Sequence, residues 1–163
     1  MSAKPKVGSE KPKAAARHNA RLAAVQALYQ MEISNRGAKG VIREFLEQRL
    51  AQPSEFFPDV QVDKTLFVKL VEQVVQNQSD IDKAIRLKLS GSWRLSRIDR
   101  TLRAILRCGC CELLFDSHAP HAVVLDEYVQ IASAFFDKKE TAFINATLDS
   151  ILHDPALLKK RHE

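Results

Sequence analysis

The segment from Trp93 to Phe115 constrains the fold most, because it carries one uninterrupted helical period. Its apolar or small residues recur at steps of three and four, which places them on one face of a helix: Leu95, Ile98, Leu102, Ile105, Leu106, Gly109 and Leu113. Four arginines form a second stripe on a different face: Arg97, Arg100, Arg103 and Arg107. Ser96 is a candidate N-cap, with Asp99 three residues later. A helix of about 20 residues is about 30 Å long, so we expect the other helices to pack around this one.

The rest of the chain shows the same helical pattern and no pattern typical of strands. No run alternates apolar and polar residues beyond a few positions, and the chain of 163 residues holds only 5 Gly. We therefore predict an all-α protein of about seven helices, with residues 14–163 forming a single domain. The six further helices are expected at residues 14–34, 41–50, 59–78, 81–89, 121–135 and 141–153. With no run of about 20 apolar residues and no signal-type segment, we expect a cytoplasmic protein without membrane contact.

The positive charge of the chain is concentrated at its N-terminus. Residues 1–21 contain six basic side chains and one acidic one, and the other 19 basic and 19 acidic residues cancel. Residues 1–13 are rich in Lys, Pro and Ser and nearly free of large apolar groups, so we predict a disordered basic arm. Such an arm is typical of binding to a polyanion, most often nucleic acid. A solvated tail that only aids solubility is the alternative.

The cysteines form the pattern that most resembles a metal site. Cys108, Cys110 and Cys111 are followed by His118 and His121, and zinc binds mixed Cys and His ligands. Within a helix, however, Cys108 and Cys111 share a face while Cys110 points away, so the three thiols do not converge. We therefore predict no metal and no other cofactor, and interpret the cysteines as small side chains that fill a tight helix crossing beside Gly109.

Motifs of enzymatic catalysis are absent from the sequence. It has no glycine-rich phosphate loop, no G-x-S-x-G elbow and no H-E-x-x-H pair. Asp126 and Glu127 are the nearest candidates for an acid and a base, but adjacent residues on a helix diverge by about 100°. A solvated polar face explains this pair better, and we predict that the protein is not an enzyme.

Nucleic-acid binding has more support from the residues. The basic arm leads directly into the first helix, where cationic, polar and aromatic side chains follow one another: Arg17, His18, Arg21, Gln26 and Tyr29. A similar mixture opens the last helix: Lys138, Lys139 and Phe143. Single-stranded RNA is held by cationic grooves and by stacking on aromatic or Arg side chains. Taken alone, Tyr29 and Phe143 are each better explained as core aromatics than as RNA contacts.

Three blocks of the chain resemble the NusB family of bacterial transcription antitermination factors. They contain A-V-Q-A-L-Y, L-R-A-I-L-R with E-L-L, and F-I-N-A-T-L-D, in the order of the family, and the likeness extends over nearly everything after residue 14. The resemblance implies two three-helix bundles packed across one another and binding of a short single-stranded RNA element, boxA. It also implies a heterodimer with the ribosomal protein NusE. With other Nus factors on RNA polymerase, that complex suppresses termination in ribosomal RNA operons and aids ribosome biogenesis.

The resemblance also implies roles for individual residues. The Arg-rich segment of the family matches Arg17 and Arg21, while His18 and Asn19 stand where relatives often have more arginine. Positions at the RNA edge of the family match three aromatic residues: Tyr29, Phe135 and Phe143. NusE docks on a helical face that includes the central helix, and the arginine stripe is a candidate for part of that face.

Two alternatives stay open from the sequence. NusB-like domains also occur fused to ribosomal RNA methyltransferases, but this chain shows no cofactor-binding βα unit. A structural helical protein that forms a homodimer through the central helix when free is the other alternative.

Overall fold

The computed structural model describes residues 7–55, 61–89, 91–116 and 119–158, and all regular secondary structure within these ranges is helical. This confirms the predicted all-α class. The helices are listed here in chain order: α1 (Val7–Ser34), α2 (Ala38–Glu44) with a π-helical turn (Phe45–Arg49), α3 (Lys64–Gln76), α4 (Gln78–Lys88), a 3₁₀ turn (Leu95–Arg97), α5 (Arg100–Phe115), α6 (His121–Phe135), α7 (Lys138–Leu152) and α8 (Pro155–Leu158).

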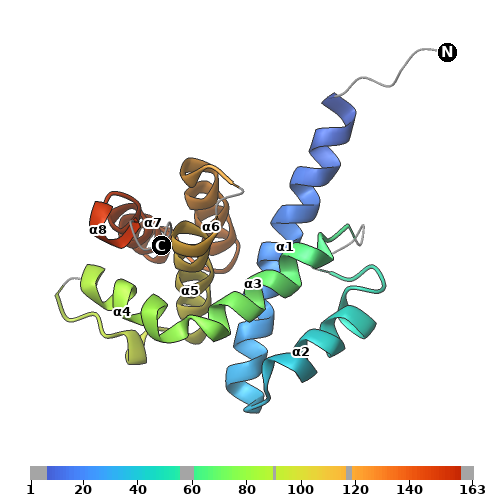
Figure 1. The fold of residues 1–163 in the computed structure, drawn as a ribbon, viewed down its shortest axis with the longest axis horizontal. Helices are drawn as coiled ribbons and strands as arrows, with labels where there is room; N and C mark the ends of the chain where they lie inside the picture. Colours follow the sequence, from blue (N-terminus) through green and yellow to red (C-terminus); the bar gives the residue numbers. More distant parts are fainter. Residues whose placement is uncertain (1–6, 56–60, 90, 117–118, 159–163) are drawn as a thin grey trace.

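Two three-helix bundles meet at α5, as Figure 1 shows. One bundle consists of α1, α2 and α3, and the other of α5, α6 and α7. Both α1 and α3 also pack against α5, while α4 lies between α3, α5 and α7. The arrangement confirms the architecture that the family resemblance implies.

The central helix α5 is buried over most of its length. Its apolar stripe packs into the core, and its cysteines are free thiols with no exposed surface. Gly109 marks the closest approach, because a Cβ added there would lie 2.7 Å from Cδ1 of Leu148 on α7. The tight crossing predicted beside this glycine is therefore confirmed. Since α5 is enclosed by α1, α3, α4, α6 and α7, it offers a second copy of the chain little surface for a homodimer.

Several predicted boundaries differ from the structure. Helix α1 begins at Val7, so part of the predicted disordered arm is helical, because a helix nucleated downstream extends at low cost. Residues 1–6 lie outside the described ranges. The N-cap of α5 is Asp99 and not Ser96, since the Asp99 carboxylate accepts hydrogen bonds from the backbone N–H groups of Thr101 and Leu102.

The C-terminal helices also differ from the prediction. Helix α7 starts at Lys138, three residues before the start predicted at residue 141. The short helix α8 was not predicted, and it buries Leu157. Within the described ranges, no helix combines the length and the apolar character that crossing a membrane requires.

Candidate nucleic-acid interface

Two long-range ion pairs fix the direction of α1 against α5. Arg21, in the middle of α1, binds Glu112 near the end of α5, whereas Glu32, near the end of α1, binds Arg103 near the start of α5. The two helices are therefore antiparallel. This geometry separates the candidate residues of α1, because Arg17 and His18 lie toward the end of α5 and Tyr29 lies toward its start.

Arg21 is the most buried of the candidate residues, with 3% of its side chain exposed. Its Nε and Nη2 atoms donate to the two carboxylate oxygens of Glu112 at 2.7 and 3.0 Å. The Tyr128 hydroxyl of α6 donates to the same carboxylate, and burial together with the charge of Glu112 raises the pKa of Tyr128. Arg21 thus joins α1 to α5 and α6, and in this structure its guanidinium faces protein groups and not solvent.

His18 lies one turn before Arg21 and is also bound to protein. Its Nδ1 is 2.7 Å from Oε2 of Glu127 on α6, and Arg21 Nη1 lies 3.6 Å from the same oxygen. Burial opposes ionisation of Glu127, but the hydrogen bond from His18 and the charges of His18 and Arg21 outweigh it and lower the pKa of this carboxylate. Arg17 is exposed. Of the three basic candidates on α1, Arg17 is therefore the most exposed to solvent.

The other candidates lie on the second half of α1 and where α6 passes into α7. Gln26 is half-buried, and Tyr29 is exposed at 38%. Only Phe136 and Asp137 separate α6 from α7. We call the residues around this connection the α6–α7 corner: Phe135, Lys138, Lys139 and Phe143. Phe135 and both lysines are exposed, so aromatic and cationic surface lie within one short segment.

Phe143 is half-buried because an unexpected residue covers it. The ring of Trp93 stacks on it with a centroid distance of 4.4 Å and an interplanar angle of 22°. Trp93 itself remains 38% exposed. The sequence pattern places Trp93 only at the start of the segment that ends at Phe115, and its separation from Phe143 along the chain leaves no local signal for the contact. The structure adds Trp93 to the aromatic surface of the α6–α7 corner.

The predicted arginine stripe of α5 does not form one surface. Arg97 and Arg100 are exposed, but Arg103 is 7% exposed and binds Glu32 and the carbonyl oxygens of Leu95, Ser96 and Ile98. Arg107 makes a two-point ion pair with Asp82 of α4, at 2.9 and 3.1 Å. Arg103 and Arg107 therefore join α5 to neighbouring segments, and exposed Arg100 also lies 3.7 Å from Glu32 of α1.

The described residues contain no cluster of three or more His, Cys, Asp or Glu side chains able to hold a metal. His118, one of the ligands considered from sequence, lies outside the described ranges. Burial raises the pKa of all three thiols, that of Cys111 to about 12. Since the three side chains are fully buried and no metal-binding cluster surrounds them among the described residues, they fit a packing role.

The chain matches the model of the NusB family over residues 18–153. It is 50% identical over 135 residues to the transcription antitermination protein NusB of Caulobacter vibrioides, covering 83% of this chain and 91% of that protein. It is 47% identical over 149 residues to the protein of the same name from Maricaulis maris, covering 91% of this chain and 93% of the relative. The relatives are named as transcription factors and not as enzymes, in agreement with the prediction.

Solved structures give the same result. The fold is similar to that of T. maritima NusB, with a TM-score of 0.69 and 27% identity over 90% of this chain and 97% of the other. A structure of the antitermination factors NusB and NusE in complex with dsRNA shares the fold with a TM-score of 0.66 and 24% identity, covering 83% of this chain and 94% of that chain. Together with the family match, these relatives show that the chain belongs to the NusB family of transcription antitermination proteins.

Proposed function

We propose that this protein is a non-enzymatic adaptor that binds boxA single-stranded RNA as a heterodimer with ribosomal protein NusE. In the bacterial cytoplasm the pair joins other Nus factors on RNA polymerase, suppresses termination in ribosomal RNA operons and aids ribosome biogenesis. Family membership supports this proposal, and a NusB of the same fold forms a complex with NusE and dsRNA.

One observation links the proposed RNA binding to particular residues. The α6–α7 corner gathers exposed Phe135, Lys138 and Lys139 beside the stacked rings of Trp93 and Phe143. Aromatic rings stack on bases and lysines neutralise phosphates, which is the combination that single-stranded RNA requires. Tyr29 and Arg17 add an aromatic and a cationic group on α1. Arg21 and His18 support this surface by fixing α1 against α5 and α6.

Fluorescence anisotropy tests the proposal. A labelled boxA-type RNA and a scrambled RNA of equal length are titrated with this protein alone and with NusE present. We expect NusE to tighten binding of the boxA-type RNA and not of the scrambled one. Equal binding of both RNAs, with no effect of NusE, would show that the protein is only a nonspecific polyanion binder.

A further inference from the structure

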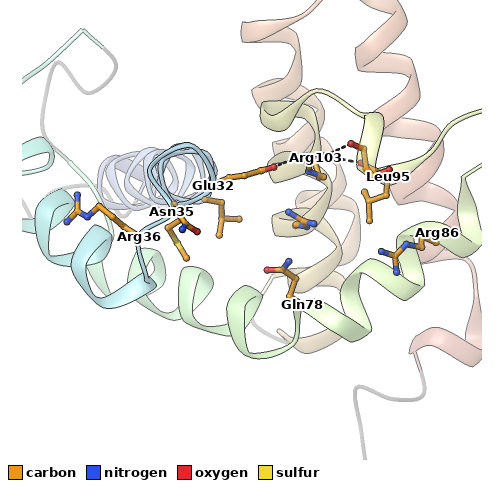
Figure 2. Close-up of a pocket in the computed structure, with 11 residues that line it drawn as sticks. Glu32, Asn35, Arg36, Gln78, Arg86, Leu95 and Arg103 are labelled. Atoms are coloured by element: carbon orange, nitrogen blue, oxygen red, sulfur yellow. Dashed lines mark hydrogen bonds and ion pairs between the residues drawn. The ribbon is translucent and has the colours of Figure 1, made fainter.

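A groove rich in arginine lies between α1, α4, α5 and the turn before α5. It consists of two pockets, of about 630 and 380 Å³, which share Arg86, Leu95 and Ser96. We call them together the arginine groove. Figure 2 shows the larger pocket, where Gln78 and Arg86 of α4 and Arg103 of α5 extend toward the same space, with Glu32 of α1 reaching toward Arg103. The smaller pocket continues the groove to Arg94 and Trp93.

The groove keeps positive charge that the protein does not neutralise. Arg107 is paired with Asp82, and the carboxylate of Glu32 is bound to Arg103. Arg86 and Arg94 are exposed, and neither makes an ion pair with a residue in the part of the chain that the structure describes. A concave surface with excess cations attracts anions more strongly than a flat one, because its low-dielectric walls focus the field.

Arg103 adds positive charge to the wall of the groove. Its Nη1 donates to the carbonyl oxygen of Leu95 at 3.1 Å and its Nη2 binds Glu32, but its Nε is buried and has no hydrogen-bond acceptor among the described residues. A buried donor without an acceptor is unfavourable and uncommon in native proteins. Protein atoms enclose this N–H group, so Arg103 adds to the positive field of the groove and does not itself contact a ligand.

The outer end of the groove is aromatic. Trp93 lines the smaller pocket and is held in place by its stack on Phe143. The exposed 38% of Trp93 leaves part of its surface open to a further planar group. An aromatic platform next to unpaired arginines is the arrangement with which proteins bind single strands, since bases stack and phosphates pair with cations.

We propose that the arginine groove binds a single strand of RNA, with one base stacked on Trp93 and a neighbouring phosphate held by Arg86. This inference rests on the proposed RNA-binding function and deepens it. It extends the RNA path from the α6–α7 corner across the turn before α5 and onto α4. None of the site residues derived from the sequence lies on α4.

The chain holds one Trp, so its intrinsic fluorescence reports on Trp93 alone. The full-length protein with NusE is titrated with boxA-type RNA, and tryptophan fluorescence and RNA anisotropy are followed together. NusE tryptophans, where present, are replaced by phenylalanine. We expect RNA to quench Trp93 with the same midpoint that anisotropy reports, because a stacked base quenches indole emission. Trp93→Ala is expected to weaken binding by about tenfold, in line with the contribution of one stacked base.

Arg86→Ala tests the phosphate contact without disturbing a pair. It is expected to weaken binding and to lower the slope of log affinity against log salt by about 0.7, the value for one phosphate on a single strand. Lys83→Ala is the matched control, since Lys83 is exposed on the same helix and lines neither pocket. We expect it to bind as the wild type does.

The outcomes distinguish a failure of the groove proposal from a failure of the proposed RNA-binding function. If the wild type binds RNA but Trp93 fluorescence stays constant, or if Arg86→Ala keeps the wild-type affinity and salt slope, the groove is not an RNA site. The proposed function then stands on other residues. If the wild type with NusE binds no RNA at all, the proposed function fails and the groove proposal fails with it.

Discussion

Arginines at the two ends of α5 have opposite surroundings. Near the end of the helix, Arg21 and Glu112 are 3% and 2% exposed and satisfy one another, with Tyr128 as a third partner. Near its start, Arg103 keeps an Nε without an acceptor among the described residues, and Arg86 on α4 stands exposed. We call the first set closed, because its charges pair with one another, and the second open, because Arg86 has no ion-pair partner among the described residues. The groups that surround an arginine, more than its charge, therefore decide whether it is available to bind RNA.

The basic residues of α1 show the same contrast between paired and exposed charges. From the sequence, Arg21 belongs to a run of cations expected to contact phosphates. In the structure its charge is compensated by Glu112 and Glu127, and His18 lies within hydrogen-bond distance of Glu127. Much of the cationic character of this part of α1 therefore stabilises the fold, while Arg17 remains exposed.

The largest effect is expected from breaking the closed set at Glu112. Glu112→Ala leaves Arg21 as a buried charge without its main partner, which typically costs about 3–5 kcal/mol of unfolding free energy. Urea denaturation followed by circular dichroism measures this loss. Asp126→Ala is the control, since Asp126 is exposed on α6 and is expected to change stability by less than about 0.5 kcal/mol.

A double-mutant cycle sharpens the same test. If Arg21 and Glu112 act as one unit, removing both costs less than the sum of the two single changes, because no unpaired charge is left. Additive losses for Arg21→Ala and Glu112→Ala would contradict the close pairing in the structure.

A smaller effect is expected at the rim of the closed set, where Glu127 is 18% exposed. Its pKa is lowered below the ordinary value of 4.5, so its contribution to stability is complete above that pH and is lost as pH falls through the lower, folded-state pKa. Glu127→Gln should therefore reduce stability at pH 7 by less than about 1 kcal/mol.

The difference between wild type and Glu127→Gln should shrink as the pH is lowered below 4.5. Urea midpoints measured for both proteins from pH 7 downward give this profile. A difference that stays constant over the whole range would show that the carboxylate acts through packing and not through its charge.

Much of the fold followed from periodicity. The apolar stripe from Leu95 to Leu113 predicted the central helix, and Gly109 predicted its close crossing. The helix limits were less accurate, because Ser96 and Asp99 both suit an N-cap and only the 3₁₀ turn between Leu95 and Arg97 decides for Asp99. Local sequence did not exclude either cap.

The site was less predictable, because its decisive contacts join residues far apart in the chain. The partner of Arg21 is 91 positions away and that of Arg107 is 25 positions away. Trp93 lies just before the 3₁₀ turn and Phe143 lies in α7, so neither periodicity nor composition indicates their stacking. Residue type predicted which side chains are suited to RNA, whereas burial and pairing determine which of them face solvent.

The most direct test of RNA binding at the α6–α7 corner uses its exposed lysines, Lys138 and Lys139. The affinity of the NusE complex for boxA-type RNA is measured against salt for the wild type, for Lys138→Ala/Lys139→Ala and for the exposed control pair Lys39→Ala/Arg43→Ala on α2. We expect the first double variant to lower the salt slope by about 1.4, from two phosphates at about 0.7 each, and the control to keep the wild-type slope. A wild-type slope in Lys138→Ala/Lys139→Ala would contradict the claim that these exposed lysines bind RNA.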